Sequence, residues 1–275
     1  MDFSLILYDR TRKRMNFSLI LYNEARKRSL ILWDYKSNVF MQIFMMMLIF
    51  IGATFLVGGG QFRPGQITSI LLGYVVWYYA RIVIMSISSQ MLGEAQVGTL
   101  EQIYMSPAHP AWILLARLFV LLFTSTVIVI IPTLLLVAPL GIHFPFRWQG
   151  LIIFALTLVG LFGLALALAG AALVFKQIGS LADLFQNVLL FLTGSLLPIT
   201  NFPHWLFVFA QILPITQGIA LVRKIVLDGQ SLGSAWNDGT LFWLTLNSLL
   251  YLGAGWLVYV VCERHAKRKG SLGQY

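Results

Sequence analysis

Long runs of residues without any acidic or basic side chain are the feature that most constrains this chain. A bilayer-spanning helix needs about 20 mostly apolar residues, because the hydrocarbon core holds no water to pair with backbone groups. One apolar stretch, residues 64–93, is interrupted by Arg81 alone. The runs without any charge occupy residues 37–62, 118–146, 148–175, 184–222 and 239–262. None shows the alternating pattern of a membrane β-barrel strand, so we predict an all-α polytopic membrane protein.

The longest run contains a break that decides how many times the chain crosses. Pro198, Pro203 and Pro214 interrupt residues 184–222, and proline breaks a helix by removing a donor and clashing with the preceding turn. We therefore expect one span there, followed by an extracellular re-entrant hairpin between spans five and six. The six transmembrane helices are expected at about 37–58, 67–91, 111–138, 150–175, 183–199 and 240–262.

Basic residues are concentrated at the two ends of the chain, and this predicts its topology. Lys and Arg in short flanking segments resist translocation. Residues 1–36 contain eight of them and the tail 263–275 contains four. Six spans place both termini in the cytoplasm, with a single transmembrane domain over residues 37–262 of a cytoplasmic (inner) membrane protein. The net charge of +9 is then a topology signal and does not indicate nucleic acid as a partner.

The amino-terminal segment contains a repeat. Residues 1–14 and 15–28 are identical at ten of fourteen positions, which is consistent with a duplicated start and with Met15 as the native initiator. In the second copy, Phe17, Ile20 and Leu21 share one helical face. The segment is therefore also expected to form an interfacial elbow helix along the inner leaflet, in contact with membrane lipids.

The predicted inner loop between spans two and three carries two acids and no basic residue. Thr99 and Gln102 have the spacing of a capping box, in which each side chain pairs with an N–H of the helix start. Gly98 permits a sharp turn before it, and Pro107 ends the helix because it moves Ser106 out of the helical region. The sequence predicts a two-turn helix at the cytoplasmic surface, which is either a capped connector or a docking element.

These residues resemble a known family. Glu94, the run Gly98-Thr99-Leu100-Glu101-Gln102 and the pair Ser106-Pro107 resemble the coupling-helix region of type-2 ABC transporter permeases, the exporter class. The later segments Gly194–Pro198, Phe202–Leu206 and Pro214–Thr216, together with Arg223, resemble the fifth span and outer hairpin of the same family over roughly residues 25–262. Ala95 and Gln96 depart from the Arg-Glu pair that many members carry there.

The resemblance implies a permease that moves an amphipathic, drug-like or lipid-like substrate, with polysaccharide or glycolipid export as the alternative. Two separate ABC ATPase subunits would carry ATP and Mg, and this chain would bind no cofactor itself. A second permease, identical or homologous, would complete the assembly. The helix at about 99–106 would dock on the ATPase. Implied coupling residues are Glu94, Gly98, Thr99, Leu100, Glu101, Gln102 and Pro107, and implied extracellular gate residues are Pro198, Pro203, Trp205, Pro214 and Arg223.

Arg81 is the most conspicuous charged residue inside a predicted span. A lone cation at the bilayer centre costs at least ~2.5–3.5 kcal/mol, so such a residue usually faces protein, water or a ligand. Arg81 is expected to bond backbone or a neighbouring helix, to lie at the permease interface, or to contact an anionic substrate head group. Trp77 and Tyr78 nearby either line the pathway or pack between helices.

Other function classes find little support. None of the lysines follows a glycine, so the ATP-binding P-loop is missing, and no H-E-x-x-H or paired acidic motif indicates an enzyme or a metal site. A secondary, ion-coupled transporter is a further alternative. However, spans two to five carry no clearly buried carboxylate for a proton relay.

Overall fold

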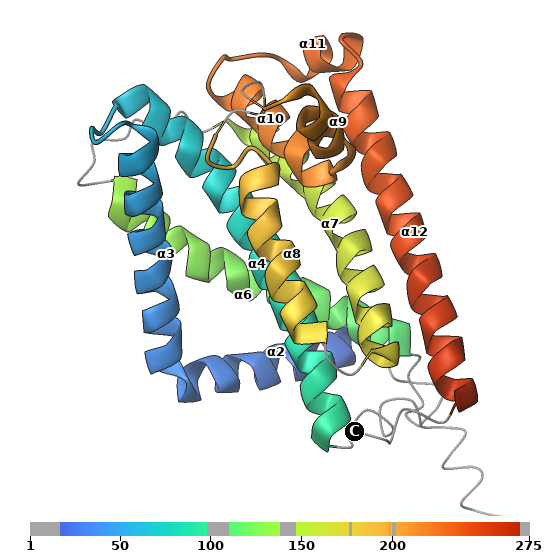
Figure 1. Ribbon diagram of the computed structural model, residues 1–275. Helices are drawn as coiled ribbons and strands as arrows, with labels where there is room; N and C mark the ends of the chain where they lie inside the picture. The colour runs from blue at the N-terminus through green and yellow to red at the C-terminus, as the bar shows by residue number, and fades with distance from the viewer. Residues whose placement is uncertain are drawn as a thin grey trace, which may run out of the picture.

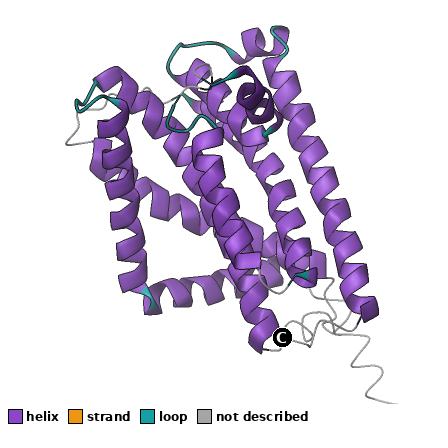
Figure 2. Ribbon diagram, in the orientation of Figure 1, coloured by secondary structure: helices purple, strands orange, loops and turns teal. Residues whose placement is uncertain are grey.

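The computed structural model describes residues 17–97, 110–137, 147–175, 178–197, 199 and 202–269. Within these residues the regular elements are helices and no strand is present, as Figure 2 shows. Five described helices are long and apolar enough to cross a membrane. They are α3 (Lys36–Val57), α4 (Pro64–Val97), α6 (Pro110–Val137), α7 (Trp148–Val174) and α12 (Thr240–Lys269). The prediction of an all-α polytopic membrane protein is confirmed.

Helix α4 forms the centre of the bundle. Figure 1 shows α6 passing obliquely behind α4, with α7 and α12 side by side to one side of it and α3 to the other. In its apolar part α4 is 83% buried, whereas α3 is only 17% buried. The first helix, α2 (Phe17–Asp34), lies across one end of the bundle, roughly perpendicular to α3 (Figure 1). We call this the elbow end.

The opposite end is covered by short helices, and we call it the hairpin end. Helices α9 (His204–Ile212), α10 (Pro214–Val226) and α11 (Leu232–Asn237) gather there in Figure 1. Helices α9 and α10 are bent by 94° at their junction. The bend occurs at Pro214, which takes the first turn of α10, where its missing N–H breaks no helical hydrogen bond. These short helices occupy the segment in which the sequence predicts the re-entrant hairpin.

The helix of the fifth span differs from the prediction. Helix α8 (Ile178–Leu192) begins earlier than the expected residue 183 and stops well before residue 199. It stops because Gly194 adopts a φ of 72°, the left-handed conformation that ends helices and favours glycine. With 15 residues, α8 is about 22 Å long, shorter than the ~30 Å hydrocarbon core. The residues of the turn at Gly194 are buried, so the turn lies inside the bundle.

Helices α7 and α12 pack at very close range. A Cβ on Gly163 would collide with the backbone of Tyr251, and one on Gly255 would collide with Gly163 itself. A Cβ on Gly170 would lie 2.8 Å from the Cα of Tyr259. Small residues let membrane helices approach until their backbones touch. The small residues of α7 thus act in helix packing, and they fix α12 against the core.

Candidate functional site

Arg223 on α10 joins three parts of the hairpin end. Its Nε donates to the carbonyl oxygen of Ser69 on α4 at 2.9 Å. Its Nη1 donates to Gly194 at 2.7 Å and its Nη2 to Ser195 at 2.9 Å, both in the turn after α8. The planar guanidinium presents several donors in fixed directions, which suits three carbonyls converging on one point. We call this arrangement the Arg223 clasp.

The clasp depends on a glycine that sequence reasoning missed. Gly73 on α4 is buried, and a Cβ there would lie 2.5 Å from the carbonyl oxygen of Ser195 and 2.9 Å from its Cα. It would also collide with the guanidinium of Arg223. Only a residue without a side chain lets α4 touch the turn and the arginine together. One glycine inside an apolar run gives no signal of this role in the sequence.

The other gate candidates lie around the bent hairpin. Pro203 precedes α9, Trp205 on α9 is 65% exposed, and Pro214 is buried against Gly160 of α7. The carbonyl of Ile212 accepts a hydrogen bond from Nδ2 of Asn247 on α12 at 2.9 Å, which fixes the end of α9. Pro198 lies outside the described residues. The structure thus places Pro203, Trp205, Pro214 and Arg223 at one end of the bundle.

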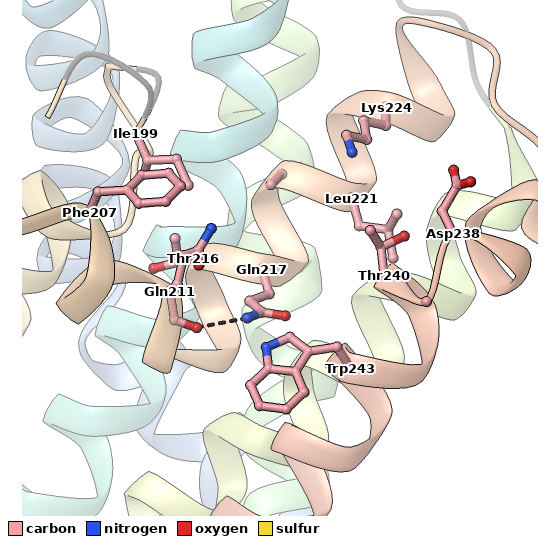
Figure 3. Close-up of a pocket in the computed structure, with 12 residues that line it drawn as sticks. Ile199, Phe207, Gln211, Thr216, Gln217, Leu221, Lys224, Asp238, Thr240 and Trp243 are labelled. Carbon is pink, nitrogen blue, oxygen red and sulfur yellow. Dashed lines mark hydrogen bonds between the residues drawn. The ribbon is translucent and has the colours of Figure 1, made fainter. Parts of the chain in front are cut away.

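A cavity of about 530 Å³ opens between α9, α10 and the start of α12. Figure 3 shows the rings of Phe207 and Trp243 along its wall, with Gln217 donating to the backbone oxygen of Gln211 at 2.7 Å. Thr216 lines the same cavity, and its buried hydroxyl has no hydrogen-bond partner among the described residues. A mostly apolar hollow with a few polar groups is the usual form of a small-molecule site.

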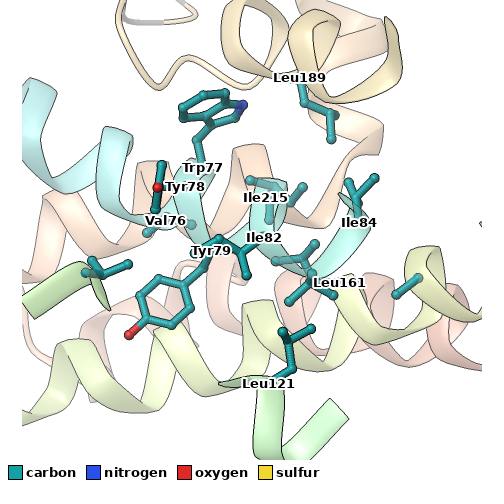
Figure 4. Close-up of a cluster of buried hydrophobic side chains, with 14 of the residues drawn as sticks. Val76, Trp77, Tyr78, Tyr79, Ile82, Ile84, Leu121, Leu161, Leu189 and Ile215 are labelled. Atoms are coloured by element: carbon teal, nitrogen blue, oxygen red, sulfur yellow. The ribbon is translucent and has the colours of Figure 1, made fainter. Parts of the chain in front are cut away.

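The three pathway candidates form one stack on α4. Trp77 and Tyr78 are only 2% and 1% exposed, and Figure 4 shows them inside the buried cluster. The indole nitrogen of Trp77 donates to the backbone oxygen of Gln186 on α8 at 3.0 Å. The Arg81 guanidinium carbon lies 5.8 Å from the Trp77 ring centroid and 5.9 Å from that of Tyr78, within range of a cation–π interaction. The two rings pack inside this chain, while Arg81 is half-exposed and lines a separate cavity.

The predicted coupling residues fall largely outside the described part of the chain. Gly98, Thr99, Leu100, Glu101, Gln102 and Pro107 lie outside the described residues, and only the backbone of Glu94 is described, on the last turns of α4. Because α4 ends at Val97 and α6 begins at Pro110, both flanks of this segment lie at the elbow end (Figure 1).

Helix α2 is docked on the start of α6 by an ion pair. Arg117 Nε lies 3.1 Å from Glu24 Oε1, and the two side chains are only 10% and 17% exposed. Beside them, the Phe17 ring makes an edge contact with Trp112 at 5.6 Å between centroids. This pair could not be found from the sequence, because the two residues lie 93 positions apart along the chain. The docking ties the elbow helix to α6, the helix that follows the predicted coupling segment.

The described residues offer little to a metal ion. No group of three or more His, Cys, Asp or Glu side chains gathers within them. A stable metal site in proteins usually needs three or four such ligands. The candidate sites of the described chain are therefore the clasp, the two cavities and the docked elbow.

The comparisons with known proteins agree with this architecture. Residues 21–227 match the family model of the ABC-2 type transporter. A comparison with curated proteins gives no match. The family model covers α2 through α10, from the elbow helix to the Arg223 clasp. The resemblance to type-2 ABC permeases is confirmed, and the chain belongs to the ABC-2 type transporter family of membrane-embedded transport subunits.

Proposed function

We propose that this chain is the permease subunit of an ATP-driven exporter that moves a drug-like or lipid-like amphipathic substrate across the cytoplasmic membrane. Membership of the ABC-2 family over residues 21–227 carries this proposal. The chain contains no P-loop, so ATP and Mg would be bound by two separate ATPase subunits. A second permease, identical or homologous, would complete the pathway.

The proposed contact with the ATPase is the segment at about 99–106. The helices on both sides of it support this, since α4 leads into it and α6 leaves it at the same end of the bundle. A push on the segment would reach α4 directly. It would reach α2 through α6, because Glu24 and Arg117 hold those two helices together. Coupling of this kind requires an element with two arrangements that both sites influence.

The proposed orientation has the elbow end in the cytoplasm. Helix α2 carries Arg26, Lys27 and Arg28 at that end, and α12 ends there with Arg264, Lys267, Arg268 and Lys269. The hairpin end carries fewer basic residues, namely Arg63, Arg147, Arg223 and Lys224. This asymmetry follows the positive-inside rule. In this orientation the clasp and the bent hairpin would lie on the extracellular side and would close the pathway.

The test is reconstitution with the ATPase. The chain is co-expressed with its candidate ATPase, purified and placed in liposomes, and ATP hydrolysis and substrate movement are measured together. We expect ATP-dependent transport in wild type. Glu101→Lys and Gly98→Pro should uncouple hydrolysis from transport while the protein remains folded and membrane-inserted.

A matched control is Asp228→Lys, which makes the same charge reversal at an exposed carboxylate after α10, at the hairpin end of the bundle. If Glu101→Lys and Gly98→Pro couple as well as wild type, the role of the segment is refuted. Full transport driven by a proton gradient with no ATPase present would refute the ABC mechanism and favour a secondary transporter.

A further inference from the structure

A second cavity, of about 1030 Å³, lies at the elbow end between α2, α3 and α4. Arg28 reaches it from α2, Gln42 from α3, and Arg81 and Ser89 from α4. Among the described residues that line it, two are arginines and none is a carboxylate. Glu24 lies one turn before Arg28 on α2, but its carboxylate is paired with Arg117.

The guanidinium groups of both arginines lack a carboxylate partner in the described part of the chain. The Nε of Arg28 is buried and has no hydrogen-bond partner among the described residues. Burial lowers the pKa of Arg28 from its ordinary value, because desolvation disfavours the charged form. Arg81 rests on Trp77 and Tyr78 through one face of its guanidinium. Guanidinium groups bind phosphate oxygens through paired, charge-assisted hydrogen bonds.

One wall of the cavity is an apolar stripe along α3. Met41, Met45 and Ile49 line it, and their spacing of four residues puts them on one face of the helix. From Met41 to Ile49 this face extends about 12 Å. Helix α3 is little buried by the chain, so its other faces are free to meet lipid. A ligand that fills the whole cavity needs an anionic head and an apolar tail.

We propose that this cavity binds a membrane amphiphile through its anionic phosphate head group. Arg28 and Arg81 hold the phosphate, and the hydrocarbon chain lies along Met41, Met45 and Ile49. The inference rests on the embedding of the helices in a bilayer and not on export or ATP. Charge complementarity favours an amphiphile over a second copy of the chain, which would need to bring a carboxylate and an apolar surface together.

Native mass spectrometry of the full-length protein, purified with any subunits that accompany it, tests the proposal. The protein is titrated with phosphatidic acid, with phosphatidylcholine and with inorganic phosphate. We expect phosphatidic acid to bind at least about tenfold more tightly than phosphatidylcholine. Arg28→Gln combined with Arg81→Gln should weaken phosphatidic acid binding by about 10- to 100-fold, the range of lost charge-assisted hydrogen bonds.

Two control proteins keep the result interpretable. Arg63→Gln with Arg147→Gln removes the same number of charges from exposed positions at the hairpin end, and its lipid binding should equal that of wild type. Arg28→Lys with Arg81→Lys keeps both charges but not the paired donors. Its affinity for phosphatidic acid should lie between those of wild type and the glutamine protein. If the glutamine protein does not fold, weaker binding by the lysine protein than by wild type supports the proposal, and equal binding overturns it.

Three results would overturn the proposal. The first is equal affinity of the wild-type protein for phosphatidic acid and phosphatidylcholine, or equal affinity for phosphatidic acid of the glutamine protein and of the control with Arg63→Gln and Arg147→Gln. The second is displacement of phosphatidic acid by inorganic phosphate at the same concentration, which would identify a free anion as the ligand. The third is loss of a dimer mass from the glutamine protein with lipid binding intact, which would identify a protein interface. ATPase coupling enters none of these measurements, so the proposed function can fail independently.

Discussion

Replacing Arg223 tests the most specific contact of the hairpin end. The residue makes three charge-assisted hydrogen bonds, to Ser69, Gly194 and Ser195. Ser69 lies inside α4, so its carbonyl still has the helical N–H of Gly73 as a partner when the arginine is removed. The carbonyls of Gly194 and Ser195 follow the end of α8 and have no helical partner of this kind. Arg223→Ala therefore leaves two acceptors without their donors.

The magnitude follows from this count. Hydrogen bonds to charged groups contribute about 1.5–3 kcal/mol each, and contacts that share one network do not add fully. We expect Arg223→Ala to lower the free energy of unfolding by about 3–5 kcal/mol. At about 2–4 °C per kcal/mol for a chain of this size, Tm should fall by roughly 6–20 °C. Arg223→Lys, which keeps the charge and can reach fewer carbonyls, should lose about half as much.

Cys262 gives a direct assay, because it is the single cysteine of the chain and is half-buried. Thermal unfolding in detergent is followed by the reaction of this thiol with a fluorogenic maleimide. Arg147→Ala is the matched control, since Arg147 is exposed and reaches one carbonyl, that of Gly229, at 3.3 Å. A Tm for Arg223→Ala equal to that of the Arg147→Ala control would refute the clasp as a stabilising contact.

Two further predictions concern contacts that the sequence did not reveal. Gly73→Ala should destabilise the hairpin end by about 1–3 kcal/mol, because the added methyl displaces Arg223 and the turn at Ser195. Gly65→Ala on the same helix meets open space and should not lower Tm. A double-mutant cycle of Glu24→Gln and Arg117→Gln, read by the same thermal assay, should give a coupling energy of about 0.5–2 kcal/mol, above that of an exposed pair because both side chains are largely buried. A coupling energy near zero would contradict the docking of α2 on α6.

The helices could be predicted from the sequence because their signal is compositional. An apolar run longer than about 20 residues has few structural alternatives in a membrane, and α3, α4, α6, α7 and α12 all occupy such runs. Pro214 likewise predicted the break in the hairpin. The end of α8 could not be placed, because a single glycine at residue 194 ends the helix before the first proline is reached.

The contacts of the candidate site were beyond prediction for a different reason. Family resemblance pointed to Arg223, but its partners are backbone carbonyls, and one of them lies 154 residues away. Carbonyl groups are present at every residue, so a sequence cannot mark the ones that a side chain will meet. The same applies to the cavity at Arg81. The arginine was conspicuous, but its neighbour Arg28 lies on another helix and belongs to a basic run that suggested only lipid attraction.

Helix α4 runs continuously past the Arg223 clasp, the proposed amphiphile cavity and the start of the proposed coupling segment. It accepts the clasp at Ser69, carries Arg81 at the cavity and reaches Glu94 before the segment. The distance from Ser69 to Glu94 is about 38 Å along a continuous helix. No proline interrupts α4 after its first residue. A continuous helix can transmit a displacement from one end to the other. If the proposed coupling segment moves, the cavity at Arg81 and the clasp at Ser69 should therefore change together.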